Sequence, residues 1–362
     1  MSLVAEKDWD MLLDFFPEEY GKQIKRVIKA TQVLTVDPKP EVGPTPKEVV
    51  WTKNKTKLYR YISEQPKKHK IPLLMVYALI NKPYVLDLTK GGSLIEYLVN
   101  NGFDVYLLDW GTPGYEDRNM KLDDFIIDYI PRAVKKVLKT SNADELSILG
   151  YCMGGTMTSI FAALYPELPI RNLVFMTSPF DFEDSGSYGE MLNEKYFNID
   201  KVVDTMGVIP PEMIDYGNKL SKPMANFYGP FISLVDRADN ESFVKSFQLL
   251  QKWLNDGIPF PGESYRQWIR DFYQKNKLIK GELVVRGRKV DLKNITANVL
   301  NLAGQNDLIA QPHMVEALMD AISSKDKQFN NLPVGHTSIT FGRQASKITY
   351  PTIGDWLAER SN

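Results

Sequence analysis

The chain has 362 residues, and its 43% hydrophobic and 11% aromatic content is enough for a substantial core in one large domain with an insertion, or in two domains. The 44 lysine and arginine residues nearly cancel the 45 aspartate and glutamate residues, which argues against a broad charged surface for nucleic acid or an anionic membrane. A single cysteine cannot form an internal disulfide, so the chain suits a reducing compartment.

The N-terminal part gives the first structural expectations. Acidic residues follow only a few apolar positions, so we expect no secretory signal, and the most apolar early run, 71–80, has about half the length of a bilayer span. We therefore predict a cytoplasmic protein without a transmembrane segment. Residues 1–36 are predicted to be helical and amphipathic with Asp8 as a candidate cap, 36–49 to be a proline-rich linker, and 49–62 to form two short strands around a turn.

From residue 73 onward, predicted strands and helices alternate. The strands span 73–77, 103–111, 146–150 and 171–179, and the helices span 93–100, 123–139 and 153–165. Ser93 and Glu96 form a Ser-x-x-Glu capping box at the start of the first of these helices. Because the strands are near-continuous apolar runs, the pattern predicts a mostly parallel sheet with helices on both faces.

The alternation stops between residues 181 and 284, where the sequence is rich in aromatic residues, Pro and Met and has mostly helical periodicity. It then resumes with strands 297–304 and 327–335 and helices 312–323 and 343–360. We therefore predict an N-terminal helical segment and linker (1–44), an α/β core in two parts (45–180 and 285–362), and an inserted cap subdomain (181–284).

The only cysteine, Cys152, lies in Gly-Tyr-Cys-Met-Gly-Gly between a predicted strand and a predicted helix. This is the nucleophile-elbow arrangement of the α/β-hydrolase fold, with Cys in place of Ser. Gly150 and Gly154 allow the strand and the helix to approach closely, and the N–H of Met153 at the helix N-terminus is suited to an oxyanion. The alternative is that Cys152 is a small buried side chain beside packing glycines.

An elbow nucleophile is expected to be followed along the chain by an acid and then by a histidine. His336 directly follows the last predicted strand, and Asp307 lies just beyond the strand 297–304, so both can reach the edge of the sheet where Cys152 lies. His336 could instead be a surface-loop histidine, and Asp307 could merely cap the next turn. The other two histidines, His69 in a charged turn and His313 at a helix start, are expected to face solvent.

Other features of the sequence carry weaker expectations. A second oxyanion donor is expected in the loop 76–83 near Ala78 to Ile80, and we choose Ile80, while Asp109 is expected to fix a turn. Arg286, Arg288 and Lys289 form a basic cluster that could bind a substrate or be a solvated face. The sequence has no metal-ligand cluster, phosphate loop or Gly-x-Gly-x-x-Gly motif, so we predict an enzyme without a metal or cofactor.

The chain resembles the catalytic subunit of polyhydroxyalkanoate synthases, most closely the short type that requires a second subunit. The Bacillus-like class IV is the best match and class III the second. From about residue 45 onward, the segments that carry the resemblance include GYCMGGT, VYALINKPYVLDL, GFDVYLLDWGTPG, YRQWIRDFYQKNKLIKGEL and RGRKVDLKNI. The catalytic Cys, Asp and His of the family fall on Cys152, Asp307 and His336.

The resemblance implies an acyltransferase that polymerises (R)-3-hydroxyacyl groups from their CoA thioesters and releases CoA. It also implies a growing polyester with a granule surface, a small second subunit, and a homo- or hetero-oligomer. In the family's proposed mechanism the acid also helps to activate the 3-hydroxyl. Two alternatives remain open: a cysteine-nucleophile hydrolase such as a thioesterase, and a polyester-binding granule protein without turnover.

Overall fold

The computed structural model describes residues 16–35 and 40–361. They divide into two compact units: the described residues up to Glu41 together with Lys219–Asn255, and Val42–Asn218 together with Asp256–Ser361. The predicted cap boundaries at 181 and 284 both fall inside the second unit, so the predicted domain division stays a prediction. Asp8 and the rest of residues 1–15 lie outside the described residues.

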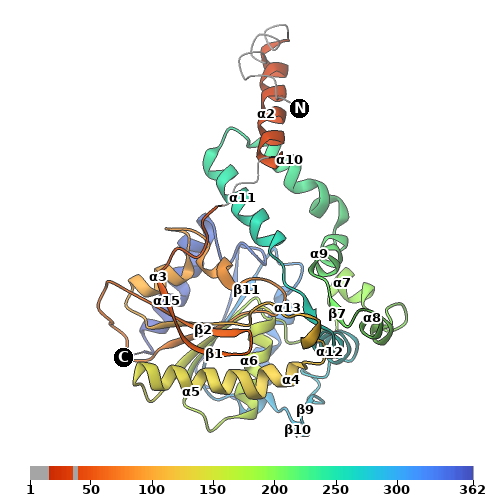
Figure 1. Cartoon of the computed structure of the whole chain (residues 1–362). Helices are drawn as coiled ribbons and strands as arrows, with labels where there is room; N and C mark the ends of the chain where they lie inside the picture. The colour runs from red at the N-terminus through yellow and green to blue at the C-terminus, as the bar shows by residue number, and fades with distance from the viewer. Residues whose placement is uncertain (1–15, 36–39, 362) are drawn as a thin grey trace. The chain divides into compact units, whose positions relative to one another are not determined.

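The second unit is built on an eight-stranded sheet (Figure 1). In spatial order its strands are β1 (Lys47–Lys53), β2 (Thr56–Tyr61), β4 (Val105–Asp109), β3 (Leu73–Val76), β5 (Leu146–Tyr151), β6 (Ile170–Met176), β11 (Asn298–Gly304) and β12 (Lys327–Leu332). The pairs β1–β2 and β2–β4 are antiparallel, and all other pairs are parallel. The predicted entry hairpin and the mostly parallel sheet are confirmed.

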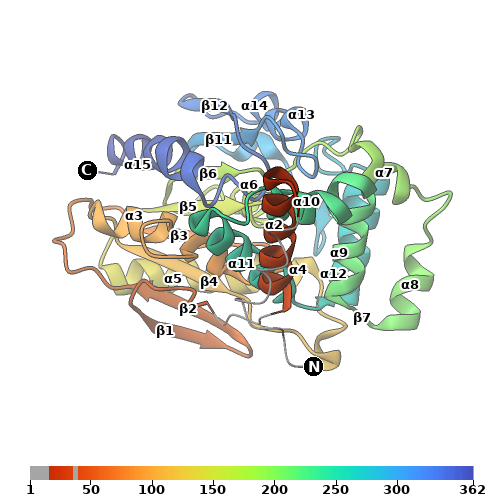
Figure 2. The same cartoon turned by 90° about the horizontal axis from the view of Figure 1, so that it is seen from above.

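Helices cover both faces of this sheet (Figure 2). They are α3 (Leu94–Asn100), α4 (Leu122–Asp124), α5 (Ile130–Ser141), α6 (Met153–Leu164), α13 (Pro312–Glu316), α14 (Leu318–Ala321) and α15 (Tyr350–Ala358). Every residue of β3, β5 and α6 is buried, because each is packed on both sides. The near-continuous apolar runs of these strands follow from that double packing.

The inserted residues are mostly helical, as predicted. In the second unit they form α7 (Gly186–Met191), α8 (Ile199–Met206), most of α9 (Pro211–Leu220), α12 (Gly262–Gln267), a π-helical segment (Trp268–Gln274), and the short strands β7 (Val208–Ile209) and β8 (Phe260–Pro261). At the end of the insertion, β9 (Val284–Val285) pairs with β10 (Arg288–Lys289). The first unit contains α2 (Glu18–Thr35), a π-helical segment (Met224–Tyr228), α10 (Gly229–Asp236) and α11 (Glu241–Asn255). Its core contains Ala30, Leu234, Ala238 and Phe247, and Arg26 and Lys29 both pair with Asp239.

Proline explains where several helices depart from regular α geometry. The π-helical segments Phe125–Tyr129, Met224–Tyr228 and Ala345–Thr349 each end two residues before a proline, namely Pro131, Pro230 and Pro351. A proline ring has no N–H to donate and clashes with the carbonyl four residues earlier, so the preceding turn widens.

Two local expectations need correction. Ser93 caps α3 by accepting a hydrogen bond from the N–H of Glu96 at 2.9 Å, but the Glu96 carboxylate accepts from the N–H of Gly91 instead of closing a capping box. His69 is half-buried rather than solvated, because its ring stacks on Phe103 with the ring centroids 4.0 Å apart.

Candidate active site

Cys152 occupies the turn between β5 and α6, and its backbone is strained. Its φ of 52° and ψ of −128° lie in a region that residues with a side chain rarely adopt. The turn is held in place because the N–H of Cys152 donates to the carbonyl of Met176 at 2.9 Å. Strain of this kind at the end of a buried strand is what an elbow needs to lift a nucleophile above the sheet.

The glycines around Cys152 are required by close backbone packing. A Cβ at Gly150 would overlap Gly155 of α6, and a Cβ at Gly154 would overlap the carbonyl of Val76 at the end of β3. A side chain at either position would therefore push the helix away from the sheet, so the predicted role of Gly150 and Gly154 is confirmed.

Asp307 is fully buried in the loop after β11 and uses both carboxylate oxygens. Oδ1 accepts from the N–H groups of Ile309 at 2.8 Å and Ala310 at 2.9 Å, and Oδ2 lies 2.7 Å from Nδ1 of His336. Asp307 thus does both things that its position suggested: one oxygen caps the following turn and the other binds His336.

His336 connects Asp307 to Cys152. Its Nδ1 is engaged by Asp307, and Cys152 lies close enough for its charge to act on the ring. Burial alone would lower the pKa of His336, but the negative charges of Asp307 and Cys152 and the hydrogen bonds to both raise that pKa well above its usual value. The structure therefore brings Cys152, His336 and Asp307 together at one edge of the sheet.

The loops that carry the acid and the histidine are tied to each other. The N–H of Gln305 donates to the carbonyl of Leu332 at 2.8 Å, and the N–H of Asn306 donates to the carbonyl of Val334 at 3.0 Å. Since β11 and β12 are parallel neighbours, these bonds extend their pairing past the strand ends. The sheet therefore holds the start of both loops, up to Asn306 and Val334.

Four tyrosines near Cys152 were not found by sequence reasoning. Burial raises the pKa of Tyr77, Tyr151, Tyr188 and Tyr273, and the charge of Cys152 raises each of them further. The pKa of Tyr188 rises to about 12. The Tyr188 and Tyr273 rings meet edge to face at 5.3 Å, and both come from the predicted cap segment. Aromatic content pointed to a pocket lining, but not to these residues.

The two expected oxyanion donors lie at the ends of β5 and β3. Met153 is the first residue of α6, so its N–H has no acceptor within the helix. The carbonyl of Ile80 accepts from the N–H of Ile258 at 3.1 Å, and Tyr84 in the same loop donates to Asp256 at 2.6 Å, which anchors the loop. The assignment of Met153 and Ile80 stays a prediction.

The remaining singled-out residues lie in other parts of the fold. Asp109 fixes a turn by accepting from the N–H of Gly111 at 2.9 Å, as expected. His313 is exposed, with Nε2 2.7 Å from the carbonyl oxygen of Asp184.

The basic cluster is engaged in structural contacts. Arg286 pairs with Asp124, and Arg288 donates to the carbonyl of Leu164 and stacks over Tyr165 at 4.6 Å. The contacts of Arg288 are at the C-terminal end of α6, a helix length of roughly 18 Å from Cys152.

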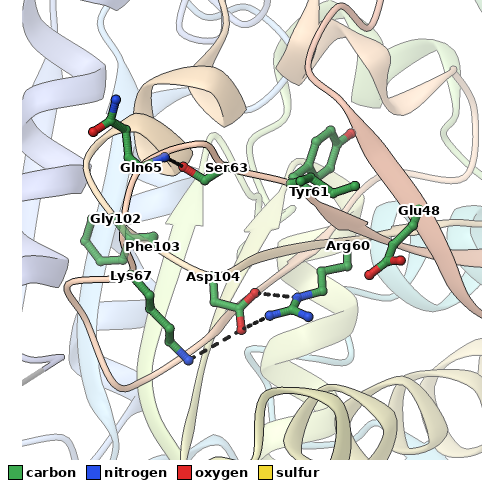
Figure 3. Close-up of a pocket in the computed structure, with 10 residues that line it drawn as sticks. Glu48, Arg60, Tyr61, Ser63, Gln65, Lys67, Gly102, Phe103 and Asp104 are labelled. Carbon is green, nitrogen blue, oxygen red and sulfur yellow. Dashed lines mark hydrogen bonds and ion pairs between the residues drawn. The ribbon is translucent and has the colours of Figure 1, made fainter.

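A surface pocket of about 320 Å³ lies at the opposite end of the strands (Figure 3). Three of its charged groups pair with each other: Arg60 donates to both oxygens of Asp104 at 2.9 and 3.2 Å, and Lys67 lies 3.4 Å from the same carboxylate. Asp104 precedes the first residue of β4, whereas the candidate site is at the carboxyl ends of the strands. This pocket is therefore separate from Cys152.

Within residues 16–35 and 40–361, no group of three or more His, Cys, Asp or Glu side chains is arranged to hold a metal ion. Over the same residues, no helix has the length and apolar character needed to cross a membrane. The prediction that no cofactor is required stays a prediction.

Comparison with known proteins gives the class of the fold first. Residues 71–340 match the sequence model of the alpha/beta hydrolase fold. A monoacylglycerol lipase from Paleococcus ferrophilus is similar in structure, with a TM-score of 0.52 and 18% identity over 84% of this chain and 99% of that one. An esterase from Thermogutta terrifontis has a TM-score of 0.50 and 15% identity over 88% and 99% of the two chains. The protein therefore has the α/β-hydrolase fold.

Sequence relatives give the family. Residues 21–98 match the N-terminal model of poly-beta-hydroxybutyrate polymerase (PhaC). The poly(3-hydroxyalkanoate) polymerase subunit PhaC of Allochromatium vinosum is 38% identical over 351 residues, which are 96% of each chain. That of Synechocystis is 37% identical over 88% of this chain and 86% of its own, and that of Haloferax mediterranei is 37% identical over 95% and 70%. The chain belongs to the PhaC family of poly(3-hydroxyalkanoate) polymerase subunits.

Proposed function

We propose that this chain is a polyhydroxyalkanoate synthase catalytic subunit that transfers (R)-3-hydroxyacyl groups from CoA thioesters to a growing polyester and releases CoA. The observation that carries the proposal is the 38% identity with a PhaC subunit over 96% of both chains. The group of Cys152, His336 and Asp307 supplies chemistry that fits this reaction.

Acylation begins at Cys152. His336 takes the proton of the Cys152 thiol, and the sulfur anion formed in this way attacks the thioester carbonyl carbon. A bond forms between that carbon and Sγ of Cys152, the bond from carbon to the CoA sulfur breaks, and Nε2 of His336 gives its proton to the CoA sulfur. One thioester replaces another, so the acyl group stays activated.

Chain growth consumes the thioester on Cys152. A 3-hydroxyl attacks the acyl carbon, the new ester C–O bond forms, the C–S bond to Cys152 breaks, and His336 accepts the hydroxyl proton. His336 then returns this proton to the Cys152 sulfur, which regenerates the starting state. Both oxygens of Asp307 are engaged by Ile309, Ala310 and His336, so Asp307 acts on the hydroxyl through His336 rather than directly.

A tetrahedral oxyanion forms in both steps, and hydrogen-bond donors of the protein must stabilise it in place of water. The N–H of Met153 at the start of α6 is the first donor, and the N–H of Ile80 in the anchored loop after β3 is the second.

The tyrosines close to Cys152 surround the thioester with aromatic rings instead of water, which favours transfer to a hydroxyl over hydrolysis.

The exposed side chains of the first unit support the proposal that the protein associates with polyester. Nine of the seventeen large hydrophobic side chains exposed among the described residues lie in this unit, although it is a small part of the described chain. In the segment after α9 they follow helical spacing, at Met224, Tyr228, Phe231 and Ile232. Exposed apolar patches mark interaction sites, so this unit is suited to the granule surface in the cytoplasm. A small second subunit is the other expected partner of the chain.

A test supplies 3-hydroxybutyryl-CoA to the purified chain, alone and co-expressed with a small second synthase subunit. Free CoA, polymer and free 3-hydroxybutyrate are measured together. The proposal expects CoA release matched by polymer. CoA release matched by free 3-hydroxybutyrate would instead establish a thioesterase, and polymer binding without CoA release in either preparation would establish a granule-binding protein.

A further inference from the structure

Tyr151 links the nucleophile to the candidate base through three contacts. It is the last residue of β5, directly before Cys152, and its hydroxyl donates to the backbone carbonyl of His336 at 2.9 Å. Its ring lies 5.6 Å from the His336 ring and stacks on Tyr77 with the centroids 5.1 Å apart and the planes 11° apart. Tyr77 follows β3 and His336 lies in the loop after β12, so this stack joins three strand ends.

We propose that Tyr151 is a positioning residue, which holds the His336 loop against the elbow so that Nε2 faces Cys152. This inference rests on the proposed function and deepens it, because none of the groups assigned above fixes the main chain of His336. Asp307 holds only the Nδ1 end of the ring, and a ring held at one atom can still swing. The bond from Tyr151 anchors the residue at its other end.

The residue before His336 does not anchor the loop to the rest of the fold. The preceding Gly335 contributes no side chain, and its N–H is bonded only within the loop, to Ser338 Oγ at 2.8 Å. Tyr151 therefore connects this short loop to a fully buried strand. Burial raises the pKa of Tyr151 well above its usual value, so its hydroxyl stays a donor throughout the pH range in which the enzyme works.

The chain offers a matched control for this contact. Tyr350 is buried and its hydroxyl also donates to a backbone carbonyl, that of Thr340 at 2.8 Å, a few residues further along the same segment. Tyr151→Phe and Tyr350→Phe therefore delete the same group from the same kind of bond. Phenylalanine keeps the ring in each case, so both variants retain their packing and are expected to fold.

The experiment compares both variants in the full polymerase with 3-hydroxybutyryl-CoA, and measures Cys152 alkylation by iodoacetamide and thermal midpoints. We expect Tyr151→Phe to lower kcat roughly tenfold to a hundredfold with KM within about twofold, because a base misplaced by about 1 Å loses that much. Tyr350→Phe is expected to keep kcat within about twofold. The pH profile of Cys152 alkylation should shift in Tyr151→Phe alone.

Two results would overturn the inference. The first is a Tyr151→Phe variant with wild-type kcat and a wild-type alkylation profile. The second is an equal loss of kcat in both variants, in proportion to the decrease of their thermal midpoints. The second would mean that the loop needs stability rather than positioning. A wild-type chain that is alkylated but transfers no acyl group would refute the proposed function, and the alkylation profiles would still decide the role of Tyr151.

Discussion

Replacing Asp307 by asparagine tests the electrostatic account of the site. In Asp307→Asn the amide oxygen can keep the N–H groups of Ile309 and Ala310, so the loop remains capped. The amide NH₂ then faces Nδ1 of His336, which must accept, and this moves the ring proton to Nε2, toward Cys152. With its proton already on Nε2, His336 cannot accept another there from Cys152, and the corresponding change in a serine protease triad costs about 10⁴ in kcat.

The same variant changes the titration of His336. The Asp307 charge and hydrogen bond raise the His336 pKa, so removing them should lower it. A raised folded-state pKa stabilises the fold fully below the unfolded value of about 6.5, and this stabilisation is lost as the pH rises through the folded pKa. Each pKa unit between the folded and unfolded states contributes about 1.4 kcal/mol to the free energy of unfolding. The variant should therefore lose more stability near pH 6 than near pH 9.

The assay is imidazole NMR, which suits a chain with three histidines. The His336 signal, assigned by comparison with His336→Gln, should keep its proton above pH 6.5 in the wild type and release it at lower pH in Asp307→Asn. CoA release should fall roughly 10⁴-fold in parallel. An unchanged His336 titration in the variant would refute the reasoning, whatever the effect on activity.

Three further predictions follow from the elbow and its surroundings. Cys152→Ala should give no labelled acyl-enzyme by mass spectrometry while folding normally by circular dichroism, and covalent labelling of that variant would refute the nucleophile assignment. Gly154→Ala should lower the thermal midpoint and activity together, by roughly 2 kcal/mol or more of stability, since its Cβ would overlap Val76. Arg288→Ala should leave KM for the acyl-CoA within about twofold, and a larger rise would place CoA at the basic cluster.

The fold could be predicted because its signals are local. Buried strands such as Leu146–Tyr151 are continuous apolar runs, and the glycines beside Cys152 specify a close turn without knowledge of any distant residue. Asp307 and His336 could be placed because parallel strands bring their carboxyl ends to one edge. The sequence could not say that Asp307 would cap a turn and bind His336 at the same time.

Features that depend on long-range packing were missed. Tyr188 and Tyr273 reach the surroundings of Cys152 from a segment without strand–helix alternation, so no periodicity marks them. Tyr151 was part of the elbow motif, but its bond to His336 spans 185 positions and depends on the order of the strands. The spacing of Ser93 and Glu96 fits a capping box, but the N–H of Gly91 donates to the Glu96 carboxylate instead.

The most direct test of the account is the chemical state of Cys152 during turnover. The polymerase is mixed with 3-hydroxybutyryl-CoA, quenched in acid, digested and analysed by mass spectrometry. We predict that the peptide containing Cys152 carries hydroxybutyryl units as a thioester, in step with CoA release, and that the adduct is absent from Cys152→Ala. CoA release and polymer growth with an unmodified Cys152, or an adduct on another residue, would contradict the account.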